Sequence, residues 1–430
     1  MKLRRLVLLL AVLSAGTLWA STSRGATTAT PTGLPLYQFV DTGTGPLPWN
    51  AVSLQSTLHA TTMVGGPHSA EGPNGGVIAY RTNTGALADL VIHDDNTTQW
   101  NNLTANNDVP VPGADPVPFF DPYGNVDLLY VDQASHVILL SPNETLGPWW
   151  RQLHGGAPWR PLVSTDLTAL TGVLAANGLP SVQVAVTTGT IAYRTSTNAL
   201  EVVRLTWNNL DPLPVYAGLA HTINPPVEKP PPVTTTTTTT TSTSPSTSSP
   251  TSSSTTTTTT TTTVAPATPA FASDPVVLPG LVGAVAATLN NGALVDFINT
   301  GSLFSTWGSQ NLTAITGSPK VAGSLSATGT ASTADVAVLT TSGTVELFST
   351  VLSNLVTSTT SAPPSSTTTS TVVTPSLPAG AATWNVQNVT ALATGSPPLS
   401  GALALNATSS QLTIAGQAAN WGDLFVLSNA

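Results

Sequence analysis

The sequence predicts an all-β chain: a β-propeller of about six blades, interrupted by disordered Ser/Thr/Pro-rich insertions. Three observations predict this fold. A strand–turn–strand phrase recurs along the chain, a tryptophan-led phrase recurs between its copies, and the period is about 50 residues where nothing interrupts it. Strand-rich repeats of about this length are typical of propeller blades. Only 7% of the residues are charged, and Gly, Thr, Ser and Val are common, which suits a turn-rich β fold.

The recurring hairpin is best preserved in two segments, "IAYRTNTGAL" at 78–87 and "IAYRTSTNAL" at 191–200. Each copy is an apolar run, a short Gly/Asn/Ser/Thr turn and a second apolar run, which is a hairpin signature. A weaker sixth copy covers 404–416. Aligning the other five copies places one turn residue of each in the same column: Gly85, Ser135, Asn198, Gly292 and Gly343.

The second phrase is a tryptophan followed by Asn or Asp and then by Leu-Thr-Ala or a relic of it. It begins six units, at Trp49, Trp100, Trp159, Trp207, Trp307 and Trp384. The polar position is held by Asn102, Asp166, Asn311 and Asn388. A short polar side chain followed by a hydroxyl residue can bond nearby backbone N–H groups, so we expect it to fix a turn. We expect the tryptophan to fill the gap between neighbouring sheets.

The N-terminus predicts an export signal over residues 1–26. Lys2, Arg4 and Arg5 precede the apolar run Leu6–Leu13, and small residues follow up to Ala26. The alternative is an uncleaved membrane anchor, although the apolar run is short for a spanning helix. No second hydrophobic segment of spanning length follows, so we expect a secreted, extracellular or cell-surface protein without a transmembrane segment after cleavage.

Two low-complexity tracts divide the repeats. We expect propeller blades at 27–224, a disordered Thr/Ser/Pro-rich tract at 225–269, more blades at 270–356, a disordered insertion at 357–378 and the last blade at 379–430. A long surface loop adds little closure entropy, which favours one interrupted propeller. The alternatives are two β modules joined by a linker, or another β sandwich or solenoid. Leu34–Asp41 is a candidate to pair with the last blade and close the ring.

The threonine runs inside the larger tract, 234–241 and 255–263, suit an O-glycosylated extended stalk. An unmodified flexible linker is the alternative.

Composition excludes several function classes. The formal net charge is −9, whereas nucleic-acid and anionic-lipid recognition need a basic surface. The chain has no cysteine, which removes thiol catalysis, disulfides and cysteine-based metal sites. We therefore expect no nucleic-acid partner, and we expect no cofactor.

The best preserved repeats carry a family resemblance. "DLTALTG" (166–172), "NLTAITGSP" (311–319), "NVTALATGSP" (388–397) and "AYRTNTGAL" (79–87) resemble the repeats of bacterial β-propeller lectin-like proteins, of the PLL-type and tachylectin-like fold. The resemblance implies a ring of blades with ligand sites between or on them. It also implies an exported, non-enzymatic protein that recognises glycans or other cell-envelope components. The alternatives are an envelope scaffold without sugar binding and, less favoured, a secreted glycoside hydrolase.

Six residues are candidates for ligand binding: Tyr80, Arg81, Trp149, Trp150, Tyr193 and Arg194. Flat aromatic faces beside hydrogen-bonding groups are what a shallow sugar site requires. Because side chains alternate along a strand, a tyrosine and the arginine that follows it face opposite ways. The alternative for each pair is a tyrosine that packs between blades and an arginine in solvent.

We assign no catalytic or metal-binding residue. The chain has no Gly-x-Ser-x-Gly elbow, and His136 is expected at the surface. Asp94 and Asp95 are expected in a solvated turn rather than in a glycosidase site. Asp121, Asn125 and Asp127 do not match a calcium-binding loop and are expected in a turn that enters a strand.

Overall fold

The structure is a computed structural model of the chain. It describes residues 37–41, 49–53, 58–72, 75–93, 97–107, 109–142, 162–185, 187–208, 211–226, 237–239, 257–259, 269–280, 283–299, 307–329, 333–351, 383–393, 397–407, 412–418 and 424–428. Among these residues, no helix is long and apolar enough to cross a membrane.

Five antiparallel sheets of four strands follow one another along the chain, and a sixth sheet of three strands follows them. The first sheet holds β3 (Met63–Gly72), β4 (Gly75–Thr82), β5 (Leu87–His93) and β6 (Thr98–Asn102); the second holds β7 (Val117–Phe120), β8 (Val126–Val131), β9 (Val137–Pro142) and β10 (Leu162–Asp166). The third holds β11 (Ser181–Ala185), β12 (Thr188–Arg194), β13 (Leu200–Asn208) and β14 (Asp211–Ile223); the fourth holds β17 (Val276–Val277), β18 (Ala284–Thr288), β19 (Leu294–Asn299) and β20 (Trp307–Asn311). The fifth holds β21 (Val321–Gly329), β22 (Thr333–Thr340), β23 (Val345–Val351) and β24 (Trp384–Asn388); the sixth holds β25 (Leu399–Ala407), β26 (Leu412–Ala418) and β27 (Leu424–Ser428).

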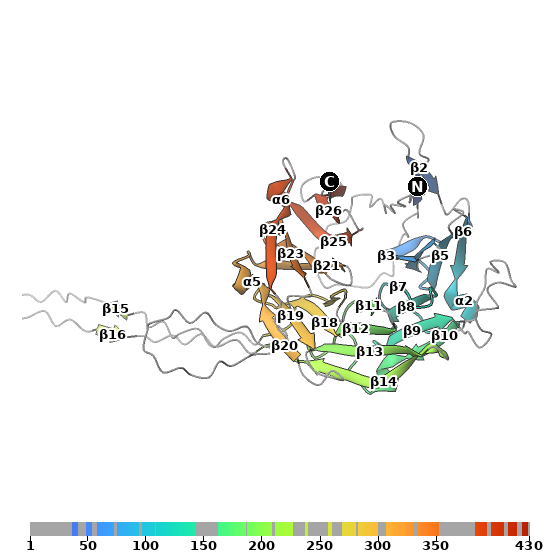
Figure 1. The fold of residues 1–430 in the computed structure, drawn as a ribbon, viewed down its shortest axis with the longest axis horizontal. Helices are drawn as coiled ribbons and strands as arrows, with labels where there is room; N and C mark the ends of the chain where they lie inside the picture. Colours follow the sequence, from blue (N-terminus) through green and yellow to red (C-terminus); the bar gives the residue numbers. More distant parts are fainter. Residues whose placement is uncertain are drawn as a thin grey trace, which may run out of the picture.

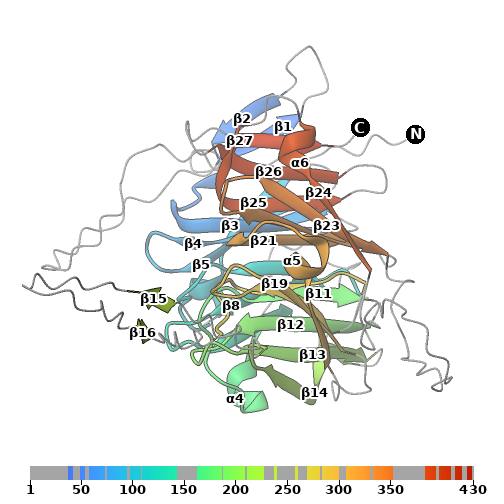
Figure 2. The same cartoon turned by 90° about the vertical axis from the view of Figure 1, so that its left-hand side faces the viewer.

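The six sheets stand side by side around a centre, which confirms the predicted β-propeller (Figure 1). The first strands of successive sheets contact one another from β3 and β7 through to β21 and β25, so they line the centre of the ring. The fourth strands lie at the periphery. Seen from the side, the strands of the stacked sheets run across the view (Figure 2).

The hydrophobic core lies between the sheets rather than in one central body. One cluster joins Leu87 of the first sheet to Tyr130 of the second, and another joins Leu200 of the third to Phe297 of the fourth. Each of the other three junctions between consecutive sheets has a cluster of its own. A sixth cluster covers the remaining face of the first sheet with Leu58 and Ala60. Middle strands are therefore buried on both faces, and this explains why they are nearly continuous apolar runs.

The five aligned turn residues share one backbone conformation. All five have positive φ, between 59° and 84°: Gly85, Ser135, Asn198, Gly292 and Gly343. Two of them, Ser135 and Asn198, are not glycine. Glycine populates this left-handed region without a steric penalty, and asparagine and other short polar residues tolerate it. In the first sheet, Gly85 N–H donates to the carbonyl of Thr82, which closes the turn.

The polar residue of the tryptophan phrase caps a short helix, where the sequence predicts only a turn. Helices α2 (Leu103–Asn107), α4 (Leu167–Thr171), α5 (Leu312–Thr316) and α6 (Val389–Leu392) directly follow the fourth strands of their sheets. In each helix the preceding Asn or Asp side chain accepts from the backbone N–H three residues later, at 2.8 to 3.0 Å. This is the N-cap geometry that Asn and Asp favour.

The threonine of the Leu-Thr-Ala phrase joins this helix to the hairpin. In three sheets its hydroxyl accepts, at 2.8 Å, from the backbone N–H of the first residue of the third strand. The pairs are Thr104 with Leu87, Thr168 with Val137, and Thr390 with Val345. The repeated phrase is therefore a structural latch between the fourth strand and the hairpin.

Three of the tryptophans fill gaps between sheets, as the sequence predicts. Trp384 of the fifth sheet joins the core that it shares with the fourth, and its Nε1 donates to Asp296 at 2.9 Å. Trp307 of the fourth sheet stacks on His221 of the third, and Trp207 packs against the second sheet. Trp100 instead donates to Tyr80 within its own sheet, at 2.6 Å. Trp159 lies outside the described residues.

Three expectations about boundaries and pairing are corrected. The tryptophan strand ends one sheet instead of beginning the next, so Trp384–Asn388 belongs to the fifth sheet and not to the last blade. The proposed sixth hairpin turn, near residue 409, joins the first and second strands of its sheet rather than the second and third. Strand β1 (Tyr37–Asp41) pairs with β2 (Trp49–Ser53), not with the last sheet. Inside the Thr/Ser/Pro-rich tract, the described residues include one short pairing, of β15 (Thr237–Thr239) with β16 (Thr257–Thr259), and β-branched threonine favours such extended backbone.

The latch predicts a specific stability loss. Thr168→Val keeps the shape of the side chain but leaves the buried N–H of Val137 without its acceptor. We expect the free energy of unfolding to fall by about 1–3 kcal/mol. Thr171→Val is the matched control, because that hydroxyl only donates back to the carbonyl of Leu167 in its own helix. Urea denaturation of both variants measures the difference, and equal losses would contradict the latch.

Candidate functional site

The tyrosines of the repeated hairpin lie inside the fold. Tyr80, Tyr130 and Tyr193 are fully buried. Each hydroxyl donates to a loop carbonyl 19 or 20 residues earlier in the chain: Thr61, Pro110 and Leu174 respectively. Burial raises the pKa of Tyr80 to about 12, although its hydrogen bonds oppose the shift. Since Tyr80 and Tyr193 expose no surface that a ligand could touch, we remove them from the candidate site.

The arginines that follow these tyrosines face outward and pair with aspartates of the next sheet. Arg81 Nε lies 2.7 Å from Asp115 Oδ1, and its Nη1 donates to the carbonyl of Gly113 at 3.3 Å. Asp115 Oδ2 accepts from the backbone N–H of Gly66 at 2.8 Å. The side chains remain partly exposed, at 26% for Arg81 and 15% for Asp115. This site joins the first sheet to the loop that enters the second.

The same arrangement recurs two sheets later. Arg194 Nη2 lies 3.6 Å from Asp274 Oδ1, with exposed fractions of 22% and 35%. The pair is looser than the first. The Nε of Arg194 and the Oδ1 of Asp274 are both buried and have no hydrogen-bond partner in the described part of the chain. One donor atom and one acceptor atom of the pair are thus without a hydrogen bond among the described residues, although Asp274 Oδ1 keeps its ion pair with Arg194 Nη2.

Glycines allow the aspartates to approach the backbone so closely. A Cβ on Gly65 would lie 2.2 Å from Asp115 Oδ1, and one on Gly178 would lie 1.8 Å from Asp274 Oδ1. Both glycines also have positive φ, of 78° and 128°. Any side chain at either position would displace the carboxylate.

Sequence reasoning found the arginines but missed their partners. Both aspartates stand in the same local phrase, Asp-Pro-Val, at the entry to the first strand of the next sheet: 115–117 and 274–276. That recurrence was the available signal. Trp149 and Trp150, the remaining candidates, lie outside the described residues.

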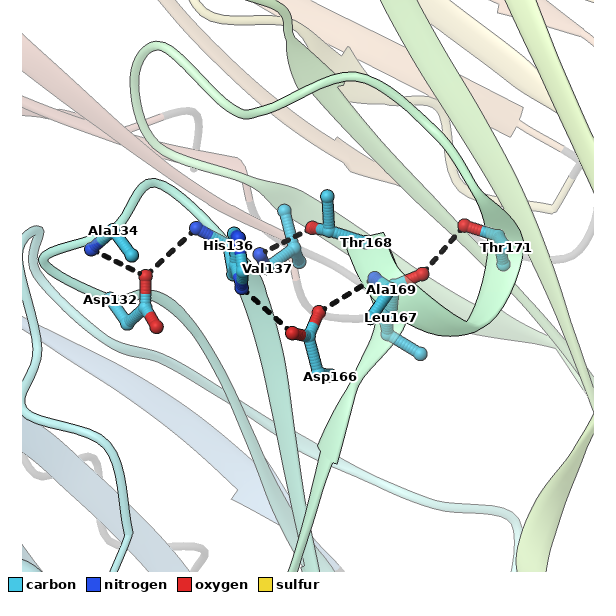
Figure 3. A network of polar contacts seen from close by, with 9 residues as sticks. All are labelled: Asp132, Ala134, His136, Val137, Asp166, Leu167, Thr168, Ala169 and Thr171. Atoms are coloured by element: carbon cyan, nitrogen blue, oxygen red, sulfur yellow. Dashed lines mark hydrogen bonds and ion pairs between the residues drawn. The ribbon is translucent and has the colours of Figure 1, made fainter.

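A second polar cluster surrounds His136 in the second sheet (Figure 3). The imidazole Nδ1 lies 2.7 Å from Asp166 Oδ2, and Asp166 Oδ1 caps α4 by accepting from Ala169 N–H. Asp132 closes the hairpin turn by accepting from Ala134 N–H and His136 N–H, both at 2.8 Å. His136, at 42% exposed, is therefore a surface residue with a structural partner.

His136 and Asp166 are residue types that occur in Ser-His-Asp catalytic triads, but a histidine and an aspartate alone do not make a triad. A triad also needs a hydroxyl nucleophile that is hydrogen-bonded to the imidazole. Within the described residues, the ring of His136 has Asp166 as its only partner. The arrangement ties the hairpin to α4 and supplies no activated nucleophile.

Of the two carboxylates considered for metal binding, Asp127 is buried in β8 and Asp121 is engaged in the turn before it. Asp121 accepts from the backbone N–H groups of Tyr123 and Asn125 and from the Asn125 side chain. No group of three or more His, Cys, Asp or Glu residues in the described ranges is placed to hold a metal ion. Asp94 and Asp95 lie outside those ranges.

Buried acids recur near the start of the third strand in four sheets: Asp89, Glu201, Asp296 and Glu346. Burial raises the pKa of Asp89 from 3.8 to about 7, partly opposed by the hydrogen bond from Asn101 at 2.7 Å. Burial likewise raises the pKa of Asp296 to about 7, against hydrogen bonds from Trp384 and from Gln310 N–H. Desolvation of the charged form is the dominant cause in all four acids.

The fold and the site together define a six-sheet β-propeller with partly exposed Arg–Asp pairs between sheets. No known family model matches the chain. No curated protein matches it in sequence either.

Solved structures that resemble the chain, all at low sequence identity, include several lectins. BP39L from Burkholderia pseudomallei is 14% identical over 92% of both chains, with a TM-score of 0.42. The Aleuria aurantia lectin, in complex with Fucalpha1-6GlcNAc, is 8% identical over 86% of this chain and 93% of its own, with a TM-score of 0.42. AofleA from Arthrobotrys oligospora is 8% identical over 85% of this chain and 82% of its own, also with a TM-score of 0.42. At these scores the propeller assignment rests on the sheets described above, and no site residue is transferred.

The raised pKa values predict that stability depends on pH. Between pH 4 and 7 the folded protein holds a proton on Asp89 that the unfolded chain releases. The free energy of unfolding therefore falls as pH rises through this window, by about 1.4 kcal/mol per pH unit for each such acid. Asp89→Asn keeps an acceptor for Asn101 and removes the titration, so its loss of stability with pH should be smaller.

Thermal unfolding from pH 4.5 to 7.5 measures the slope for the native chain, for Asp89→Asn and for the control Asp335→Asn, whose carboxylate is only half-buried. If Asp89→Asn and the native chain lose stability in parallel across the window, Asp89 is not protonated in the folded protein.

Proposed function

We propose that the protein is an exported, non-enzymatic propeller that binds glycans or other hydroxyl-rich envelope ligands at its inter-sheet Arg–Asp pairs. Export is supported by the basic and apolar N-terminal sequence. The net charge of −9 favours a neutral ligand over a polyanion.

The observation that carries the proposal is the unsatisfied pair in the second site. Arg194 Nε is a donor and Asp274 Oδ1 an acceptor, and neither has a hydrogen-bond partner among the described residues. A buried polar atom without a partner is costly, so a ligand that supplies both an acceptor and a donor gains from filling the site. Adjacent sugar hydroxyls do both, because each hydroxyl donates one hydrogen bond and accepts others.

The geometry also fits a shallow site rather than a catalytic one. The two side chains expose 22% and 35% of their surface, so other atoms of the pair are reachable from solvent, and a ligand reaches the buried Arg194 Nε and Asp274 Oδ1 only if the pair separates. Arg81 and Asp115 form an equivalent but satisfied pair, so they are expected to bind the same class of ligand more weakly. Two similar sites on one ring would give avidity toward a surface that displays repeated glycans.

An envelope scaffold is the second candidate, and one observation favours it. The position four residues before the turn residue holds Arg in only two sheets, the first and the third. In the other three aligned sheets it holds Val131, Thr288 and Leu339. The Thr-rich tract, as a spacer or an O-glycosylated stalk, suits either function.

Glycan-array binding of the chain from residue 27 tests the proposal. Arg194→Gln is expected to weaken binding of the preferred glycan about tenfold or more, the value of a hydrogen bond to a charged group. Arg81→Gln should have a smaller effect. Arg204→Gln is the control, because it removes a charge from the same sheet on β13, away from the pair.

Retention of full binding by Arg194→Gln would place the ligand elsewhere. If the folded native chain binds no glycan and no envelope fraction, the scaffold is the better description.

A further inference from the structure

In the described part of the chain, the sixth sheet has no counterpart of the strand that the five preceding sheets place at their periphery. The five preceding sheets have four strands each, whereas β25–β26–β27 has three. β27 begins at Leu424, two residues after Gly422, just as the third strands of the first and fourth sheets begin at Leu87 and Leu294, two residues after Gly85 and Gly292. β27 is thus a third strand, and the missing element is the fourth.

β2 carries the sequence of a fourth strand. Trp49 precedes Ser53 by four residues, just as Trp307 precedes the capping residue Asn311 and Trp384 precedes Asn388. Serine is among the preferred capping residues. Leu54 follows it, where the other copies place Leu or Val, and Leu58 is helical. From Ser53 to the start of β3 at Met63 is ten residues, the same as from Asn311 to the start of β21.

The hydrogen bond of the buried tyrosine gives independent support for aligning Ser53 with the capping residues of the other sheets. Tyr130 donates to the carbonyl of the residue eight positions after the cap Asn102, and Tyr193 to the carbonyl eight positions after the cap Asp166. In the first sheet, Tyr80 donates to the carbonyl of Thr61, which is eight positions after Ser53. Thr61, before β3, therefore holds the same position relative to Ser53 and to a buried tyrosine as Pro110 and Leu174 hold relative to their capping residues.

We propose that β2 is the fourth strand of the sixth sheet and closes the ring by pairing with β27. One edge of β2 is already paired with β1, and its other edge carries no pairing in the described residues. The outer edge of β27 is likewise unpaired there. Figure 2 draws β1 and β2 at the same end of the molecule as β27. Two open edges are an aggregation hazard that mutual pairing removes.

The other sheets set the register of this pairing. In four of them the second residue of the third strand pairs with the capping residue: Ala88 with Asn102, Ile138 with Asp166, Val295 with Asn311, and Glu346 with Asn388. The same rule pairs Phe425 with Ser53. Antiparallel continuation then pairs Leu427 with Ala51 and Val426 with Val52.

Engineered disulfides test the register, and the chain has no cysteine of its own to interfere. Directly paired residues have Cα atoms about 4.5–5.5 Å apart, within the range that a disulfide spans. Ala51→Cys with Leu427→Cys should therefore oxidise to a bond within one chain, seen by peptide mapping and by faster migration on a non-reducing gel. Val52→Cys with Val426→Cys repeats the test on the opposite face of the strand.

The matched control is Ala51→Cys with Phe425→Cys, which lies two residues out of register on the same face. It should cross-link at least severalfold more slowly than the in-register pair. Circular dichroism of each reduced variant confirms the native fold before oxidation. Equal rates for the two pairs, absence of cross-linking in both in-register pairs, or bonds between chains would each overturn closure of the ring by β2.

Discussion

Packing between sheets is the constraint on which the rest of this molecule depends. Each middle sheet is covered on both faces by its neighbours, so its inner strands tolerate almost no polar side chain. The polar groups that remain on these strands must be hydrogen-bonded or uncharged. This accounts for the raised pKa of Asp296 and for its hydrogen bond from a tryptophan of the next sheet. It also accounts for the few charged residues, since little of each sheet reaches solvent.

The same constraint concentrates variation at the margins of the sheets. The residue four positions before each turn lies where two sheets and a loop meet, and it is Arg, Val, Thr or Leu in different copies. Where it is Arg81 or Arg194, the segment that enters the next sheet supplies an aspartate, and an earlier segment supplies a glycine, Gly65 in β3 or Gly178 before β11. Three separate segments of the chain must therefore change together to create one polar pair. A repeat fold can thus keep its hydrophobic core while it gains or loses a polar site at any one junction between two sheets.

Much of the architecture could be predicted from the sequence because it depends on residues that are close together in the chain. Positive φ at Gly85 and Ser135 follows from hairpin turns, and the capping role of Asn311 follows from its side chain. The partners of Arg81 and Arg194 were not predictable in the same way, since Asp115 and Asp274 lie 34 and 80 residues further along the chain. Tyr80 was ambiguous, because a large aromatic residue with a hydroxyl suits both a sugar site and a buried contact with a loop carbonyl. Only the packing of the neighbouring sheet decides between the two.

The position of the smaller Ser/Thr-rich segment has a further consequence. It joins β23 to β24 within the fifth sheet, so the chain leaves that sheet and returns to complete it. After the return, β24 pairs with β23, Trp384 bonds to the fourth sheet, and Thr390 accepts from Val345. A protease that cut the chain between 352 and 382 would therefore produce two polypeptides that remain one particle. The described contacts that hold β24 and α6 in place are all made by residues outside the segment between 352 and 382.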